Sequence, residues 1–239
     1  MEKSILYVKE NQIAIITLNR PERRNAINQD LLTNLYNAID LASKDDEIST
    51  LIITGNGKSF CAGIDLTALA SEDLFDPRKD GRDMIDVFRG CQKPVIGAVN
   101  GHAVTGGFEL ALNCDFLIAS ETASFADTHA RVGIHPGWGM TQLLQQAVGQ
   151  RMAKQLSFSC EFISADKALS LGLVNEILPA DRLLDRAKEI AQSIGSVNQQ
   201  MMITIKELIE RKNTTSFEKA IIEEKIGFRE FVDMNLKTK

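Results

Sequence analysis

The chain has 239 residues, of which 44% are hydrophobic and 25% are charged, and its formal net charge at pH 7 is −5. This length and composition indicate one large domain, or one domain with a small appendage, that can bury a substantial core. The acidic balance argues against a nucleic-acid-binding surface, and no apolar run approaches the roughly 18 residues that a membrane span requires.

In the first 120 residues, strand patterns alternate with helix patterns. The predicted elements, in chain order, are strands over 4–8 and 13–18, a helix over 28–44, a strand over 50–54, a helix over 83–92, and strands over 95–99 and 116–120. Asn28 has a side chain suited to cap the first helix. The alternation, in ββα-like units, predicts an α/β core with a coiled, layered sheet.

After about residue 140 the pattern becomes mainly helical. The predicted helices cover 140–148, 165–171, 181–193, 199–211 and 216–233, and only the strand pattern at 173–178 interrupts them. The segment GSVN at 195–198 indicates a flexible join. We therefore expect a core over residues 1–195 and a C-terminal helical subdomain over residues 196–239.

The cysteine pattern indicates a reducing compartment. The four cysteines, at 61, 91, 114 and 160, form no C-x-x-C pair and have no histidine at zinc-ligand spacing. We expect free thiols and no metal site. The N-terminal segment has an early glutamate, no apolar h-region and no arginine before Arg20, which is not typical of a secretory signal or a mitochondrial transit peptide. The cytoplasm is the predicted compartment.

Two loops carry the candidate chemistry. SFCAGIDL (59–66) and NGHAVTGGFEL (100–110) each follow a buried strand and lead into a helix. A tight turn at the glycine of the first loop lets the N–H of Ile64 face outward, and Gly106 and Gly107 let a ligand approach the backbone. A helix N-terminus has unpaired N–H groups and a partial positive charge. Two such N–H groups that converge on one point form an oxyanion hole, in which each donor contributes about 3–4 kcal/mol to transition-state stabilisation.

Glu109 lies in the second of these segments, among Phe108, Leu110 and Ala111. A charge in apolar surroundings is costly unless it is paired. The carboxylate either complements the dipole of a helix that packs on the sheet or acts as a base in a dry pocket. In the second case, burial would raise its pKa and suit proton exchange near neutrality.

With these loops in place, the sequence resembles the crotonase (enoyl-CoA hydratase/isomerase) superfamily over about residues 5 to 232. The matching stretches are NRPERRNAIN (19–28), LIITGNGKSFCAGIDL (51–66), KPVIGAVNGHAVTGGFELALNCDFLIAS (93–120), FADTHARVGIHPGWGMTQLL (125–144) and ADKALSLGLVNEILP (165–179). The resemblance implies a ββα spiral core followed by a C-terminal helical subdomain. It also implies assembly as a homotrimer or a dimer of trimers through the C-terminal helices.

The resemblance further implies an acyl-CoA thioester as the ligand, with its carbonyl oxygen between the N–H groups of Ile64 and Gly106. Coenzyme A is part of the substrate in this family, and no separate cofactor or metal is expected. The residues that would contact the CoA or the acyl group are Arg24, Ala26, Ala62, Asp65, Leu66 and Trp138. For Arg24 the alternative is a solvated basic surface, and for Trp138 it is simple core packing.

In the hydratases of this family, two glutamates hold a water against C3 of a trans-2-enoyl thioester and exchange the C2 proton. Glu109 matches the first glutamate, whereas the second falls at His129. Histidine can position water or exchange a proton near neutral pH, and it can also be a structural residue of the pocket wall. Asp127 could polarise His129 or Arg131, and the spacing does not decide between them.

Three functions remain open on the sequence. The leading one is hydration of a trans-2-enoyl-CoA to a 3-hydroxyacyl-CoA. The alternatives are a Δ3,Δ2-enoyl-CoA isomerase of the same fold and a CoA-thioester-binding protein with little or no turnover, which the missing second glutamate would explain. An RNA-binding role is disfavoured by the acidic total charge.

Overall fold

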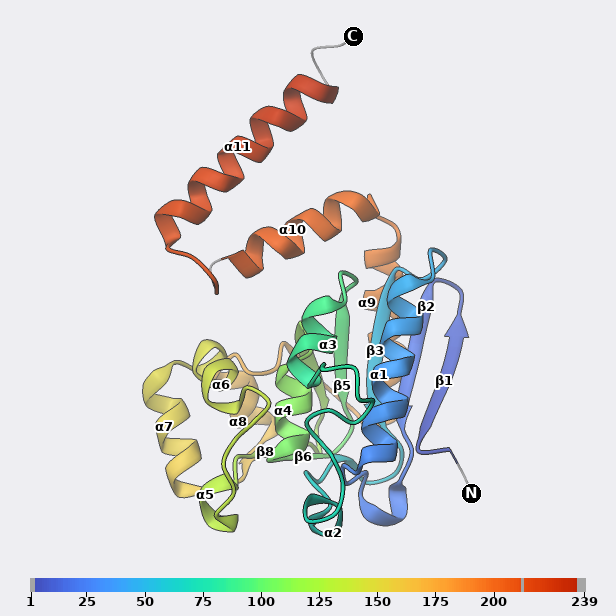
Figure 1. Cartoon of the computed structure of the whole chain (residues 1–239), viewed down its shortest axis with the longest axis vertical. Coiled ribbons are helices and arrows are strands. Elements are labelled where there is room, and N and C mark those ends of the chain that lie inside the picture. The colour runs from blue at the N-terminus through green and yellow to red at the C-terminus, as the bar shows by residue number, and fades with distance from the viewer. Residues whose placement is uncertain (1–2, 212, 236–239) are drawn as a thin grey trace. The chain divides into compact units, whose positions relative to one another are not determined.

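The computed structural model describes residues 3–211 and 213–235 of the chain (Figure 1). The chain divides into two compact units, Met1–Ser196 and Val197–Lys239. The first unit contains both sheets and the helices packed on them, and the second is helical. The division falls inside the GSVN segment.

The larger sheet in the described chain has six strands in the order β1-β2-β3-β5-β7-β10. These strands are β1 (Ile5–Glu10), β2 (Ile13–Leu18), β3 (Thr50–Gly55), β5 (Val95–Val99), β7 (Phe116–Ser120) and β10 (Glu176–Leu178). β1 pairs antiparallel with β2 across a tight turn, and the remaining neighbours are parallel. β2, β3, β5 and β7 lie where the sequence predicts them, because their apolar runs are buried on both faces of the sheet. The edge strand β1 is partly exposed.

A smaller sheet has the strand order β4-β6-β8-β9. Its strands are β4 (Ser59–Cys61), β6 (His102–Val104), β8 (Ser124–Ala126) and β9 (Ile163–Ser164). β4, β6 and β8 run parallel to one another, whereas β9 pairs antiparallel with β8. The sequence analysis does not predict this sheet, because two or three residues are too few to show a strand periodicity.

The chain passes three times from the larger sheet to the smaller sheet and then into a helix. The three helices are α2 (Leu66–Leu69) after β4, α4 (Gly106–Leu112) after β6, and α5 (His129–Val132) after β8. This is the ββα repeat expected from the sequence. Because β4, β6 and β8 are adjacent and parallel, the loops that follow them leave the small sheet at the same edge.

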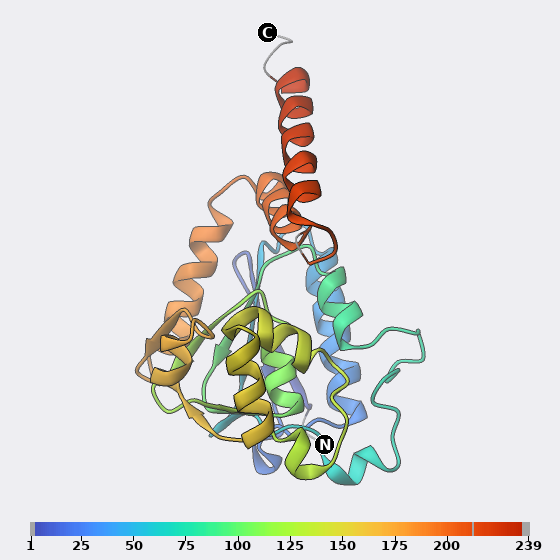
Figure 2. The ribbon, with the colours of Figure 1, turned by 90° about the vertical axis from the view of Figure 1, so that its left-hand side faces the viewer.

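Helices cover both faces of the larger sheet. One face packs on α9 (Leu183–Gly195), and the other packs on α1 (Gln29–Lys44) and α3 (Met84–Gly90). Alternate residues divide between the two sides, so that Ile13, Ile15, Ile52, Ile96, Ala98 and Ile118 share a cluster with Leu183, Ala187 and Ala191 of α9. Figure 2 shows α9 and α1 on opposite sides of the strands.

The helices α1 and α3 both begin with a side-chain cap, and the cap of α1 is the one predicted from the sequence. The side chain of Asn28 accepts a hydrogen bond from the N–H of Leu31 at 3.0 Å, as expected for the N-cap of α1. Asp83 and Asp86 form a reciprocal capping box at the start of α3, with each carboxylate accepting from the other residue's N–H. Each cap satisfies N–H groups that a helix start leaves unpaired.

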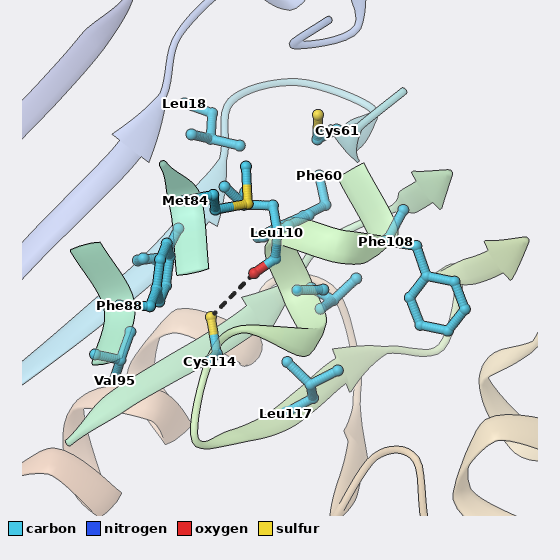
Figure 3. Close-up of a cluster of buried hydrophobic side chains, with 14 of the residues drawn as sticks. Leu18, Phe60, Cys61, Met84, Phe88, Val95, Phe108, Leu110, Cys114 and Leu117 are labelled. Carbon is cyan, nitrogen blue, oxygen red and sulfur yellow. Dashed lines mark hydrogen bonds between the residues drawn. The ribbon is translucent and has the colours of Figure 1, made fainter. Parts of the chain in front are cut away.

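Helix α4 is buried within the main core. Figure 3 shows Leu110 of this helix near Met84 and Phe60, with the Cys114 Sγ directed to the carbonyl oxygen of Leu110 at 3.7 Å. Phe108 of the same helix packs against Phe125 of β8, with ring centroids 5.5 Å apart. The short helix is thus held by apolar contacts on several sides, which gives the carboxylate of Glu109 a rigid support.

The first unit is completed by a η1 turn (Pro21–Arg23), α6 (Met140–Val148), α7 (Gln150–Ser159) and α8 (Ala165–Ser170). The helix α7 is not predicted from the sequence. Its segment QRMAKQLSFS buries only Ala153 and Leu156, so it has too narrow an apolar stripe to be recognised.

The second unit consists of α10 (Gln199–Arg211) and α11 (Phe217–Asn235). Arg211 forms an ion pair with Glu223 across the two helices at 3.1 Å. Large apolar side chains on both helices are exposed, namely Met201, Ile205, Ile209, Phe217, Ile222, Ile226, Phe228, Phe231 and Met234. Among the described residues, none of the helices combines the length and the apolar character that a bilayer crossing requires.

Candidate active site

The loops after β4 and β6 lie against each other. A Cβ built on Gly63 would be 3.6 Å from the backbone nitrogen of Gly106, and one built on Gly106 would be 3.2 Å from Cγ1 of Ile64. Within the described residues, neither the N–H of Ile64 nor that of Gly106 donates to a protein acceptor. Two unpaired donors in neighbouring loops are the arrangement that an oxyanion hole requires.

The backbone of Thr105 is strained immediately before the second donor. Its φ of 52° and ψ of −113° are outside the regions that β-branched residues adopt, a strain of about 1–3 kcal/mol. Two contacts hold it: its N–H donates to the carbonyl oxygen of Ala126 at 2.8 Å, and its hydroxyl forms a short hydrogen bond with the hydroxyl of Thr128. The strained residue turns the chain directly from β6 into α4, so that the N–H of Gly106 stays outside the helical hydrogen bonds.

The two glycines of the TGG segment have different functions. A Cβ on Gly106 would lie 3.2 Å from both Ile64 and Trp138, on the side of the donor loops. A Cβ on Gly107 would lie 2.1 Å from the carbonyl oxygen of Cys61. The expectation that a ligand approaches both glycines is therefore wrong for Gly107, whose missing side chain lets α4 pack directly on β4.

Glu109 is 1% exposed and has defined partners. Its Oε1 accepts hydrogen bonds from the N–H of Trp138 at 2.9 Å and from the N–H of Met140 at 3.2 Å. Burial raises the pKa of this carboxyl, while the backbone N–H groups and the nearby His129 partly oppose the rise. Because the backbone donors hold Oε1, the other oxygen, Oε2, is left for chemistry.

Oε2 of Glu109 faces His129, the residue at the position of the family's second glutamate. The distance from Oε2 to His129 Nε2 is 3.6 Å, and the imidazole is also buried. His129 is the first residue of α5, so its place follows from the end of the third parallel strand, β8. The structure therefore brings together the two predicted catalytic side chains, at a spacing beyond a direct hydrogen bond.

Asp127 contacts His129 and not Arg131. Its Oδ1 lies 2.7 Å from His129 Nδ1 and also accepts the N–H of His129 at 3.1 Å. Arg131 instead donates to the carbonyl oxygen of Cys160 at 2.9 Å. Burial would raise the pKa of Asp127, but the hydrogen bonds from His129, the Ser157 hydroxyl and the charge of His129 hold that pKa below its ordinary value.

The two segments predicted to contact the CoA, which contain Arg24 and Ala62, are joined through their backbones. The N–H of Ala62 donates to the carbonyl oxygen of Arg24 at 3.0 Å, and Ala26 and Ala62 are both partly exposed. Asp65 caps the short helix α2, and Leu66 beside it is 62% exposed. The side chain of Arg24 is exposed, and its backbone is left-handed. These five positions lie beside Ile64 along the chain or in the segment bonded to it, and we refer to them as the rim.

Arg20 contacts this rim, and the sequence analysis does not identify it. Its guanidinium donates to the carbonyl oxygen of Ala26 and, at 3.3 Å, to Oδ2 of Asp65. It therefore ties the segment before α1 to the segment after β4. Its position at the start of NRPERR is the available signal, but only the fold shows that Asp65 is its partner.

Trp138 forms a wall beside the second donor. Its indole is 1% exposed, and its Cζ3 is 3.2 Å from the Cβ position of Gly106. The ring also packs on Phe75, with centroids 5.4 Å apart, and its Nε1 has no hydrogen-bond partner among the described residues. The indole of Trp138 therefore packs in the core and also lies beside Gly106, so the two sequence-based interpretations of this residue do not exclude each other. The described residues contain no group of three His, Cys, Asp or Glu placed to hold a metal ion.

The comparisons with known proteins identify the family of this chain. A family model described as enoyl-CoA hydratase/isomerase matches residues 8–237. The short-chain-enoyl-CoA hydratase of Clostridium acetobutylicum is 39% identical over 95% of this chain and 88% of its own length. The crotonyl-CoA hydratase of Syntrophomonas wolfei is 41% identical over 82% of this chain and 77% of its own length.

Solved structures show the same fold. An enoyl-CoA hydratase from Mycobacterium avium superposes with a TM-score of 0.79 at 40% identity, covering 97% of this chain and 98% of that one. One from Geobacillus kaustophilus reaches a TM-score of 0.88 at 28% identity, covering 96% and 90%. The expected fold class, an α/β spiral core with C-terminal helices, is confirmed. Because the family model matches residues 8–237 of the 239 residues of this chain, the chain belongs to the enoyl-CoA hydratase/isomerase family.

Proposed function

We propose that this protein adds water to a trans-2-enoyl-CoA and forms a 3-hydroxyacyl-CoA. The observation that carries the proposal is the pair of unpaired N–H groups, on Ile64 and Gly106, in the loops next to the buried pair Glu109 and His129. The first pair would bind the thioester oxygen, and the second would handle the water and the proton.

The chemistry follows from this arrangement. Negative charge that develops on the thioester oxygen is stabilised by the N–H groups of Ile64 and Gly106. Oε2 of Glu109 removes a proton from the water while the oxygen of that water bonds to C3. Protonated His129 gives its Nε2 proton to C2. Transfer of the proton from Glu109 to His129 then restores the starting state. The raised pKa of Glu109 suits this exchange near neutral pH.

The names of the relatives support the substrate class. Two similar proteins are called short-chain-enoyl-CoA hydratase and crotonyl-CoA hydratase. In this chain the indole of Trp138 occupies the space beside Gly106, which would limit the length of the acyl group. We therefore propose a short-chain substrate, with coenzyme A as part of it and no further cofactor. The rim residues Arg24, Ala26, Ala62, Asp65 and Leu66 would contact the CoA moiety.

The test follows the absorbance of the conjugated enoyl thioester with crotonyl-CoA and longer trans-2-enoyl-CoAs. Glu109→Gln keeps the size of the side chain but removes the base, and we expect kcat to fall by about 10²–10⁴-fold. Titration calorimetry should show unchanged binding of acetyl-CoA. The control is Glu161→Gln, which changes an exposed glutamate and should keep full activity.

Three results would contradict this proposal. A wild-type protein that binds acetyl-CoA but does not hydrate any enoyl-CoA would be a binding protein without turnover. If the protein converts a trans-3-enoyl-CoA to the conjugated isomer faster than it hydrates a trans-2-enoyl-CoA, it is an isomerase. Full activity of Glu109→Gln would remove this carboxylate from the mechanism.

We further propose that the protein is a homotrimer or a dimer of trimers and that it works in the cytoplasm. The exposed apolar side chains of α10 and α11 support an assembly surface, because contiguous apolar patches of this kind are costly in a monomer. The burial of all four cysteine side chains supports a reducing compartment. Light scattering of the wild type and of Ile209→Ser with Phe228→Ser tests the assembly. An unchanged molar mass in the double variant, or a monomeric wild type, would contradict it.

A further inference from the structure

Asp127 is a buried carboxylate that the hydration step does not use. It is 2% exposed, and it lies on the side of His129 that faces away from Glu109. Its hydrogen-bond partners are the Nδ1 atom and the backbone N–H of His129. The Ser157 hydroxyl of α7 also favours its ionised form and lowers its pKa. A buried carboxylate is costly unless donors satisfy it, and here two donors of His129 converge on it.

The hydrogen-bond roles follow from the charge of Asp127. The pKa of this group lies below its ordinary value, so the carboxylate is ionised near neutral pH and can only accept hydrogen bonds. His129 Nδ1, at 2.7 Å, must therefore carry a proton. The Nε2 atom is then the one that gains or loses a proton, and it is also the atom that faces Oε2 of Glu109.

The charges at the site make the two neighbours of His129 complementary to its imidazolium. Ionised Glu109, protonated His129 and ionised Asp127 sum to −1, and Nε2 holds one transferable proton. Without Asp127, the imidazolium would lose one of its two carboxylate neighbours.

We propose that Asp127 is a positioning residue that keeps the proton of neutral His129 on Nδ1 and stabilises its imidazolium, so that Nε2 can deliver a proton to C2. This inference rests on the proposed hydration. The charged groups that face the imidazole are Glu109 of α4 and Asp127, which lies two residues before His129. Ser157 of α7 lowers the pKa of Asp127. The guanidinium of Arg131 donates to the carbonyl oxygen of Cys160 instead.

The test uses Asp127→Asn, which keeps the size of the side chain. The amide loses the negative charge, and its N–H can donate to Nδ1, which would move the imidazole proton to Nε2. We expect kcat for crotonyl-CoA hydration to fall by about 10²-fold or more. The alkaline limb of the kcat/KM profile should move to lower pH by about one unit, because the imidazolium loses stabilisation. Ser157→Ala should cause a smaller shift in the same direction, and the exposed Asp166→Asn should leave the profile unchanged.

A second measurement does not depend on turnover. The ¹⁵N shifts of His129 in the wild-type protein should show neutral imidazole protonated on Nδ1, and in Asp127→Asn they should show Nε2. A wild-type proton on Nε2, or a pH profile of folded Asp127→Asn equal to that of the wild type, would overturn the role of Asp127. If Asp127→Asn does not fold, the wild-type ¹⁵N shifts and the Ser157→Ala profile decide. A wild-type protein with the Nδ1 proton but no hydratase activity would refute the proposed function alone.

Discussion

Trp138→Phe tests whether the indole limits the acyl group while it also fills the core. The change keeps an aromatic ring in contact range of Phe75 but shortens the side chain where Cζ3 lies 3.2 Å from the Cβ position of Gly106. We expect a folded enzyme whose preference moves from crotonyl-CoA toward longer enoyl-CoAs.

The effect on stability is the difference of two terms. Loss of part of a fully buried ring leaves a cavity that costs about 1–3 kcal/mol. The same change removes Nε1, which is buried and has no partner among the described residues, and an unpaired buried donor costs about 1–3 kcal/mol in the native state. The free energy of unfolding should therefore change by no more than about 2 kcal/mol. In a chain of this size that corresponds to a Tm shift of no more than about 4–8 °C.

The effect on specificity follows from the space released. The removed ring atoms leave room for about two methylene groups, and each buried methylene contributes about 0.8 kcal/mol. The ratio of kcat/KM for a hexenoyl or octenoyl thioester to that for crotonyl-CoA should rise by about 10-fold.

The assays are thermal unfolding by circular dichroism and hydration rates over a series of chain lengths. The exposed Phe162→Leu serves as the matched control and should alter neither. An unchanged chain-length profile in a folded Trp138→Phe protein would show that the indole is core packing alone. A Tm loss above about 10 °C would show that Nε1 makes a stabilising contact in the protein.

Two further predictions concern Gly106 and the pH dependence of stability. Gly106→Ala should lower kcat/KM by about 10²-fold with little change in CoA binding, because the new Cβ would press on Ile64 and Trp138 at 3.2 Å and displace the N–H donor. Gly107→Ala should fail to fold, because the new Cβ would lie 2.1 Å from the carbonyl oxygen of Cys61. Enzyme assays and soluble yield check this pair, and a fully active Gly106→Ala enzyme would contradict it. The pKa of Glu109 is raised in the native state. At pH values between the ordinary glutamate pKa and the raised one, the native state therefore binds more protons than the unfolded chain. The contribution of Glu109 to the free energy of unfolding falls as the pH rises through that window. The Tm of Glu109→Gln minus that of the wild type should therefore be larger at pH 8 than at pH 4, and an equal difference at both pH values would contradict the burial argument.

Much of the fold follows from local patterns in the sequence. The long strands of the larger sheet are apolar runs, α1 begins at a residue suited to cap it, and α6 and α10 have the predicted bounds. The helix α7 and the small sheet do not follow from local patterns, since their segments are too short or too weakly amphipathic. Their positions depend on strands and helices that are distant in the sequence.

The kinds of groups at the site follow from the amino-acid sequence alone: two glycine-containing loops after strands, the lone acid Glu109, and His129 where the family has a glutamate. Which of these groups meet depends on how distant segments fold onto one another. The parallel pairing of β4, β6 and β8 brings three loops to one edge, which places Glu109 opposite His129 and puts the indole of Trp138 beside Gly106. Asp127 likewise contacts His129 and not Arg131, whose guanidinium donates to the carbonyl oxygen of Cys160, the residue that follows α7. Local propensity depends on neighbours along the chain, whereas a catalytic contact depends on distances that packing alone sets.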